Sequence, residues 1–428
     1  MIQYSKRFGA ILFMLLTVLG VVVAQNGMNS PLTRYGFGQF SDQNLGGNKA
    51  MGGIGIGLRD GSQINVSNPA SYSDVDSLTF LFEVGMSLQN ANFSDGTNKL
   101  NAKNSSFDYL AMQFRLAKRF GMTLGVLPYS SVGYKFTSTE TLPAGSEWSD
   151  EVTATRSYAG EGGLHQVFAG VGYGITPRLS VGLNAAYLFG NFQHQVSASF
   201  SDANMYSLAR TYYAEISDFT LDFGAQYTMN FGKKHKATLG ATYSWGHDLN
   251  ATEAYISEKS SIDSVRNISN AFQLPHAFGV GATYVYDEKL TVGADVKLQK
   301  FGDVRYFGEE GKLADRVKYS LGVQYLPDPM GASFLKSLKY RFGAYYSKPY
   351  VKVNGQEAAR EYGVSLGVAC PIFTRWNTLG GRQFSIVSVS GEWVKVDPKV
   401  EGVLTENYLR LSIGLTFNQG WFYKQKVR

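Results

Sequence analysis

Histidine and serine side chains are the first candidates for catalytic chemistry in this sequence. The histidines are His165, His194, His235, His247 and His276. An acyl hydrolase would need one of them hydrogen-bonded to a serine and oriented by an aspartate or asparagine. His247 is followed by an aspartate, but no spacing of histidine, serine and acidic residues favours such a site. We therefore expect no catalytic residues and no enzyme activity.

Sequence motifs for metals and cofactors are also absent. The single cysteine, Cys370, excludes an intramolecular disulfide framework and a cysteine-rich zinc site. No HExxH, Walker or calcium-loop motif occurs. The spacing Gly53-x-Gly55-x-Gly57 resembles part of a dinucleotide-binding loop, but the pattern of a following helix and βαβ unit is missing. We expect no cofactor and no bound metal.

The amino-acid composition excludes several classes of protein. The chain has 428 residues, of which only 17% are charged, below the roughly 25% of soluble globular domains, and it contains 48 glycines. Its mean hydropathy of -0.15 excludes a bundle of membrane helices, whose long apolar segments would make the value strongly positive. The net charge of +6 is small and dispersed, so we expect no nucleic-acid partner.

The first residues have the pattern of a secretory signal peptide. Lys6 and Arg7 form a basic start, the run from Phe8 to Val23 is apolar, and small residues precede a cleavage site before Gln25. As a helix, the apolar run would span only about 24 Å, which is short of the ~30 Å core of a bilayer. We expect residues 1–24 to be a signal peptide and the mature chain to be exported.

Apolar residues recur at every second position in many segments. Near the C-terminus they are Leu409, Leu411, Ile413, Leu415 and Phe417, with polar or small residues between them. This period of two predicts β-strands, since a helix would scatter these residues around its axis. A soluble β-sandwich and a membrane β-barrel both show such alternation, so the pattern alone does not separate them.

The number and length of the strands favour the barrel. We predict fourteen strands, at 78–90, 107–119, 122–138, 161–175, 179–199, 210–229, 237–250, 271–286, 290–303, 316–326, 338–353, 361–373, 383–396 and 407–419. Most exceed the usual ~5–6 residues and reach the ~9–11 residues that cross a membrane at a tilt. The predicted fold class is all-β, a transmembrane antiparallel barrel of about 14 strands in residues 78–419.

The connections between these strands alternate in length. Short, turn-rich connections alternate with longer polar stretches, at 91–106, 139–160, 200–209, 251–270 and 304–315. Short periplasmic turns and long outer loops are typical of outer-membrane barrels, and an even strand number places both ends in the periplasm. We therefore predict a periplasmic tail at 420–428. The connections at 327–337 and 374–382 are longer than this pattern predicts.

Residues 25–77 precede the first strand and are rich in glycine and asparagine. The segment contains the glycine-rich run Met51 to Gly57, then Asp60, and the triplet Asn68-Pro69-Ala70 just before the first strand. With the fourteen-strand pattern, these features resemble the FadL-type long-chain fatty acid transporter family of outer-membrane barrels. The motif Ser30-Pro31-x-x-Arg34-Tyr35-Gly36 and the tail from Gly420 to Lys424 resemble its Bacteroidota branch.

The resemblance implies a barrel whose N-terminal segment forms a hatch in the lumen. The expected hatch residues are Arg34, Gly52, Gly53, Gly55, Gly57, Asp60, Asn68 and Pro69. Candidates for lining a ligand are Phe37, Phe40, Ile54 and Ile56, although core packing would explain these four residues equally well.

Four charged residues fall within predicted strands, on the face opposite the apolar stripe. They are Arg115, Asp222, Lys297 and Arg410. A charge that faces lipid costs about 2–4 kcal/mol at the membrane midplane, so we expect these residues to face the lumen. Our hypothesis is that they lock the hatch, with Arg34, Arg59 or Asp60 as partners.

The expected function is passive uptake of hydrophobic, long-chain fatty acid-like molecules across the cell outer membrane. Outer-membrane lipid and the hydrophobic substrate would then be the partners. The resemblance leaves a second hypothesis, a structural or shuttle subunit of a Bacteroidota outer-membrane protein export or barrel assembly complex. A third, a soluble secreted sandwich, predicts recovery in water without detergent.

Overall fold

The computed structural model describes residues 28–77, 79–96, 98–142, 152–202, 204–328, 333–373, 384–400 and 403–420. The predicted signal peptide at 1–24 lies outside the described residues, as does the predicted tail from residue 421 onwards. Within the described part of the chain, no helix is long and apolar enough to cross a membrane.

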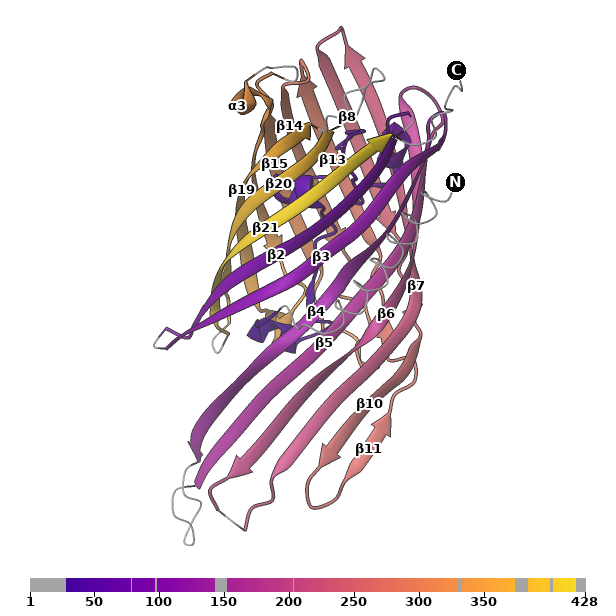
Figure 1. Ribbon diagram of the computed structural model, residues 1–428. Coiled ribbons are helices and arrows are strands. Elements are labelled where there is room, and N and C mark those ends of the chain that lie inside the picture. The colour runs from indigo at the N-terminus through magenta and orange to yellow at the C-terminus, as the bar shows by residue number, and fades with distance from the viewer. Residues whose placement is uncertain are drawn as a thin grey trace, which may run out of the picture.

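Fourteen long strands form a closed antiparallel barrel (Figure 1). They are β2 (Thr79–Ser94), β3 (Lys99–Ala117), β4 (Phe120–Leu142), β5 (Val152–Gly174), β6 (Leu179–Phe200), β7 (Leu208–Phe231), β8 (His235–Ser244), β13 (Ala277–Tyr286), β14 (Leu290–Gln299), β15 (Arg316–Tyr325), β16 (Lys339–Lys348), β19 (Ala359–Phe373), β20 (Phe384–Pro398) and β21 (Thr405–Gly420). The barrel closes because β2 pairs with both β3 and β21. The predicted fold class is confirmed.

The apolar stripes lie on the outside of the barrel. Leu409, Leu411 and Ile413 of β21 are 58%, 43% and 41% exposed, whereas the intervening Ser412 and the nearby Thr416 are buried. A soluble sandwich would bury the apolar face between two sheets and expose the polar one. Here the apolar face is exposed and the polar face is buried, so the sandwich hypothesis is wrong. The outer surface is apolar, as expected of a wall that faces lipid.

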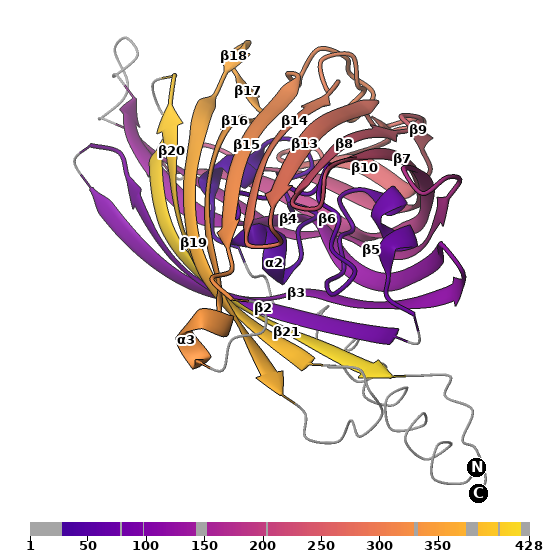
Figure 2. The same cartoon turned by 90° about the horizontal axis from the view of Figure 1, so that it is seen from above.

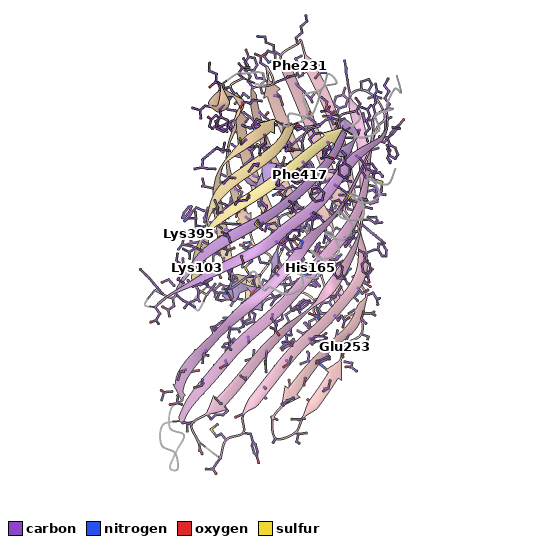
Figure 3. All side chains as sticks on the ribbon, viewed as in Figure 1. Lys103, His165, Phe231, Glu253, Lys395 and Phe417 are labelled. Carbon is purple, nitrogen blue, oxygen red and sulfur yellow. The ribbon has the colours of Figure 1, made fainter. Side chains whose placement is uncertain are left out.

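The barrel is much taller on one side than on the other. Strands β4 to β7 have 23, 23, 22 and 24 residues, whereas β13 to β16 have 10 each. The excess length projects from the lower end of the barrel in Figure 1, opposite to the end at which β21 finishes. In Figure 3, Phe231 and Phe417 lie in the upper half of the barrel, and the polar Glu253 lies in the lower, projecting part.

Several predicted loops belong to these strands. Most of 91–106 and 139–160 is paired in the ladders of β2 with β3 and of β4 with β5, so these loop predictions were wrong. The backbone ladder continues beyond the apolar band. Its inner face carries buried residues such as Ala91 and Phe93, but its outer face is mostly polar, and the outer stripe of apolar residues therefore gives no signal there.

The strand predicted at 237–250 is interrupted after Ser244. Two residues form β9 (Asp248–Leu249), and the chain then continues as β10 (Ala251–Lys259), which pairs with the projecting part of β7 and with β11 (Ser264–Asn267). The predicted loop at 251–270 therefore contains a hairpin. Similarly, the segment predicted as a strand from 271 contains the short β12 (Phe272–Gln273), and the barrel strand starts only at Ala277.

The remaining short elements lie in connections. A one-turn helix, α3 (Phe334–Ser337), lies in the long connection before β16, and β17 (Lys352–Val353) pairs with β18 (Gln356–Glu357) after it. The strand predicted at 338–353 therefore ends earlier, at Lys348. The long connection at 374–382 lies outside the described residues.

The N-terminal segment lies inside the ring of strands (Figure 2). It contains the 3-10 helix η1 (Pro31–Arg34), the two-residue strand β1 (Gln39–Phe40), the short helix α2 (Gly46–Lys49) and the 3-10 helix η2 (Pro69–Asp74). It contributes Phe37 and Phe40 to one buried cluster and Leu45, Ile64, Val66 and Val75 to another.

Candidate functional site

Glycines on the barrel wall let the N-terminal segment approach the strands closely. A Cβ atom on Gly343 of β16 would lie 1.9 Å from the nitrogen of Gly52, and one on Gly240 of β8 would lie 2.0 Å from the carbonyl oxygen of Ile56. The predicted Gly52 and Gly53 also have positive φ angles of 65° and 82°, which favour glycine. The wall glycines were not predicted as site residues. Glycine at an inward-facing position of a strand is the sequence feature that could have identified them.

The backbone of the glycine-rich run is hydrogen-bonded to side chains of the wall. Asp295 of β14 accepts hydrogen bonds from the N–H groups of Gly55 at 2.6 Å and Ile56 at 2.8 Å. The hydroxyl of Thr283 in β13 donates to the carbonyl oxygen of Gly57 at 2.6 Å. Asp295 and Thr283 were not predicted as site residues, although both stand at inward-facing positions of alternating strands.

The asparagine-proline pair before the barrel closes a turn against the wall. The Asn68 side chain accepts from the N–H of Ala70 at 3.1 Å, which caps η2, and donates to the carbonyl oxygen of Ile56 at 2.8 Å. Pro69 packs against Gly182 of β6, where a Cβ would lie 2.3 Å from the Pro69 carbonyl carbon. The motif thus joins η2, the glycine-rich run and the wall.

Ion pairs connect the segment to the wall, but the partners differ from those hypothesised. Asp60 pairs with Lys339 at 3.2 Å, and Lys49 pairs with Asp108 at 2.5 Å. Asp42 contacts Lys318 and lies 3.5 Å from Arg316. Arg59 pairs with Asp74 inside the segment. The four charged residues chosen from the sequence therefore do not pair with Arg34, Arg59 or Asp60.

Those four residues occupy other places on the inner side of the wall. Arg410 pairs with Glu392 at 3.2 Å and borders an inner cavity of about 230 Å³. Asp222 and Lys297 border a second inner cavity of about 140 Å³. Arg115 lies near the turn after β3 and donates to the carbonyl oxygen of Ala117 at 3.0 Å.

An aromatic layer fills the barrel on the side of the glycine-rich run that faces the projecting strands. Phe37 is 1% exposed and its ring contacts those of Phe192 and Phe272 at centroid distances of 6.1 and 5.6 Å. The layer also includes Phe40, Val132, Leu164, Leu188, Phe301, Tyr306, Phe307 and Tyr350. Of the predicted ligand-lining residues, Phe37 belongs to this packing and Ile54 is fully buried. Phe40 and Ile56 border cavities.

The wall itself is open between β3 and β4. These strands pair only from Leu110↔Val126 to Ala117↔Phe120. Beyond Val126, the ladder between β4 and β5 has a bulge at Pro128, and β4 pairs with β1 of the N-terminal segment at Ser130 and Ser131. Figure 1 shows the two strands separating at this height. We call this opening the lateral gap.

The lateral gap begins within the apolar band of the wall. Met86 and Leu88 of β2 face outward and are 57% and 56% exposed. They pair with Phe107 and Ser105, which lie on the part of β3 that has no pairing with β4. The opening therefore starts at the height where the neighbouring strand presents apolar side chains to the surroundings.

An inner cavity lies directly behind this gap. It has a volume of about 230 Å³ and is bordered by Ser106, Phe107 and Asp108 of β3 and by Pro128 and Ser131 of β4. Apolar groups on its lining include Met28, Leu32, Phe40, Tyr345, Val351 and Val396. Charged groups include Asp42, Lys49, Arg316, Lys318, Glu361, Glu392, Glu406 and Arg410. We call it the lateral cavity.

The histidines are dispersed and make no catalytic arrangement with serine among the described residues. His194 contacts the hydroxyl of Tyr134 at 3.1 Å, His235 that of Tyr284 and His276 that of Tyr243. His247 lies 3.7 Å from Asp218 and between aromatic rings, and His165 borders the lateral cavity. No group of three potential metal ligands occurs in the described part of the chain.

A family model decides where this barrel belongs. The model of the BamG family matches residues 1–428. The chain belongs to the BamG family. No curated protein sequence matches that of this BamG family member.

Solved structures with the same fold include transporters. The fold of this BamG family member is similar to that of a Pseudomonas aeruginosa FadL homologue, with a TM-score of 0.58 and 10% identity over 89% of this chain and 99% of that chain. The Ralstonia pickettii toluene transporter TbuX matches with a TM-score of 0.58 and 14% identity over 88% and 98%. The Pseudomonas putida toluene transporter TodX matches with a TM-score of 0.54 and 13% identity over 90% and 100%. At these identities, the likeness establishes the fold.

Proposed function

We propose that the protein is an outer-membrane barrel that lets hydrophobic small molecules pass between the membrane and its lumen through the lateral gap. The observation that carries this proposal is the end of the β3–β4 ladder within the apolar band, directly in front of the lateral cavity. The outer surface fits a bilayer, because every second residue of the strands is apolar and faces outward around a closed barrel.

The cavity fits a ligand with an apolar body and at least one polar group. Its lining combines aliphatic and aromatic side chains with ion pairs. Capture requires no chemical step, because burial of apolar surface contributes about 25 cal/mol per Å². The toluene transporters TbuX and TodX, which have this fold, act on a hydrophobic compound according to their names, and this supports the same substrate class here.

The N-terminal segment acts as the hatch in this proposal. It blocks the lumen through glycine contacts, hydrogen bonds that Asp295 accepts and Thr283 donates, and the ion pairs of Asp42 and Asp60. The aromatic layer closes the outer end. A molecule that enters from outside therefore needs a local rearrangement of these groups before it reaches the gap.

An uptake assay with a blocked gap tests the proposal. Ser106→Trp places a bulky ring at the border of the lateral cavity, whereas Ser105→Trp, one residue away, points to the exposed face of the same strand. Cells that depend on the barrel for uptake of a labelled long-chain fatty acid or toluene should lose most uptake with Ser106→Trp and little with Ser105→Trp. Equal uptake by both variants, at equal amounts of folded barrel, would contradict the proposal.

We propose a second candidate function, a structural or shuttle subunit of a Bacteroidota outer-membrane protein export or barrel assembly complex. The observation in its favour is the closed lumen, which is filled by the packed aromatic layer and by the N-terminal segment that is hydrogen-bonded to the wall. The projecting sheet of β4 to β7 offers a large surface outside the barrel.

Purification of the tagged barrel from its native membrane in mild detergent separates the two candidates. A subunit should retain stoichiometric protein partners and show no uptake defect when the gene is deleted. A transporter should purify without such partners, and its deletion should abolish uptake.

A further inference from the structure

A second large hollow lies at the projecting end of the barrel, on the far side of the aromatic layer from the lateral cavity. It is open, has a volume of about 890 Å³ and lies between the inner face of the projecting strands and the connections after β14 and β16. Tyr306 and Phe307, two members of the aromatic layer, lie at its base. We call it the outer vestibule.

Basic side chains outnumber acidic ones on the lining of the outer vestibule. The basic residues are Arg34, Arg210, Arg266, Lys312 and Lys352, and the acidic residues are Glu258 and Glu309. Glu258 pairs with Arg210 at 2.5 Å and Glu309 pairs with Lys312 at 2.8 Å. Both acidic groups are thus neutralised, and three basic residues remain without an acidic partner among the described residues.

Arg34 is the most confined of these three. Its guanidinium carbon lies 4.3 Å from the ring centroid of Tyr158 and 5.1 Å from that of Tyr35, and its side chain is half-buried. Stacking on an aromatic face holds the guanidinium plane but leaves its N–H groups free to donate to an anion. A half-buried charge without a carboxylate partner is costly, and a bound anion would offset this cost.

The other two basic residues stand on different connections. Arg266 belongs to β11 and is exposed, while Lys352 in β17 donates to the carbonyl oxygen of Gly311 at 3.2 Å. The rings of Tyr35, Tyr134 and Tyr212 also border the vestibule and supply flat surfaces with hydroxyl groups. The lining therefore combines aromatic faces with excess positive charge.

We propose that the outer vestibule binds a phosphate-bearing saccharide from outside the cell, with Arg34 as the residue that binds the phosphate. Arginine binds phosphate through paired N–H groups, and the tyrosine rings provide surfaces for sugar rings. The phosphate has two possible sources, a phosphorylated sugar of the lipopolysaccharide in the surrounding leaflet or a free sugar phosphate. This site is separate from the lateral gap, so the inference does not depend on hydrophobic transport.

Binding measurements on the full-length barrel in a neutral detergent test this inference. The probes are lipopolysaccharide, its dephosphorylated form, a hexose phosphate and the unphosphorylated hexose. We expect the phosphorylated probe to bind and its unphosphorylated counterpart to bind at least about tenfold more weakly, since it lacks the charged hydrogen bonds to the phosphate. Binding of lipopolysaccharide alone identifies a lipid-anchored ligand, and binding of the hexose phosphate identifies a free one.

Variants assign the binding to the vestibule. Arg34→Gln should weaken binding about tenfold, and Arg266→Gln, on an exposed hairpin, should weaken it about threefold without a risk to folding. Arg156→Gln is the matched control, because Arg156 is exposed on the projecting part of β5, pairs with Glu140 and does not border the vestibule. Equal affinity for phosphorylated and unphosphorylated probes, or an equal loss of affinity in the Arg156 control and the vestibule variants, would overturn the inference.

Discussion

The barrel wall is complete on one side and interrupted on the other. β13 and β14 have ten residues each and pair along all of them, from Ala277↔Gln299 to Tyr286↔Leu290. β3 and β4 have 19 and 23 residues and yet pair only near their shared turn. The gap therefore does not result from short strands. It results from a bulge at Pro128, which lacks an N–H group, and from the diversion of the β4 edge to another partner.

The N-terminal segment contacts both sides, but in different ways. On the complete side it packs against wall glycines and is held by side chains of β14, β15 and β16. On the interrupted side its backbone replaces the missing strand, with Ser30 donating to the carbonyl oxygen of Gly133 at 2.8 Å and Ser41 to that of Tyr129 at 3.0 Å. The comparison indicates that the segment covers the gap only while its contacts with β14, β15 and β16, on the opposite side of the lumen, hold it in place.

The largest effect is expected from a side chain added where the segment touches the complete wall. Gly343→Val places atoms where the backbone of Gly52 lies, and overpacking of this kind costs about 1–3 kcal/mol or more. We expect the segment to leave its seat, so that added protease cleaves residues 39–60 and small dyes leak into proteoliposomes. Gly391→Val is the control, because a Cβ on Gly391 meets no atom within 4 Å. Equal protease resistance of the two variants would show that the contact does not hold the segment.

A smaller effect is expected from loss of the carboxylate in β14. Asp295→Ala leaves the N–H groups of Gly55 and Ile56 without their acceptor, and each unsatisfied buried donor costs about 1–3 kcal/mol. Hydrogen exchange at these two amides should accelerate roughly tenfold or more. Asp295→Asn keeps one acceptor oxygen and should accelerate exchange less. If the alanine variant exchanged at the wild-type rate, the carboxylate would not be an anchor.

The smallest effect concerns pH. Burial alone would raise the pKa of Asp42, but Lys318 and Arg316 outweigh burial and hold the pKa below its ordinary value. A depressed pKa means that the stabilisation is complete above the unfolded value of about 3.9 and is lost only as the pH falls through the folded value. The protection factors of amides in the segment, which correct the exchange rate for the intrinsic effect of pH, should therefore be unchanged between about pH 5 and pH 8 in the wild type.

Removal of the main basic partner should make the segment sensitive to pH. With Lys318→Met, burial is opposed less strongly and the pKa of Asp42 should rise, so the ionised carboxylate should loosen the segment at neutral pH, and protection from exchange should recover as the pH falls and Asp42 is protonated. Lys312→Met, which breaks an exposed pair with Glu309, is the control. A flat pH profile in the Lys318 variant would show that this ion pair does not anchor the segment.

The sequence predicts the barrel well because membrane strands must alternate. Leu409, Leu411 and Ile413 show this directly, and the closed fourteen-stranded fold confirms it. Of the projecting strands, β6 and β7 were predicted at nearly their full length, at 179–199 and 210–229, whereas the outer parts of β4 and β5 were predicted as a loop, since a ladder there needs no apolar outer face. Gly52 and Gly53 were expected in the hatch from the family resemblance. The wall glycines that face the segment, Gly343 against Gly52 and Gly240 against Ile56, were not predicted, because contacts across the lumen have no signature along the chain. The lateral gap arises where β3 and β4 do not pair, and the periodicity of the sequence does not show which strands pair.

The central claim, that hydrophobic molecules use the lateral gap, is tested most directly by photolabelling. A long-chain fatty acid with a photoreactive group, added to the barrel in lipid bilayers, should label residues 105–109 of β3 and 127–132 of β4, as identified by mass spectrometry of peptides. The outward face of β14, with Val292 and Val296, lies on the complete wall and is exposed to the same lipid. Enrichment at the gap over β14 is the predicted result. Equal labelling of both surfaces would contradict the account.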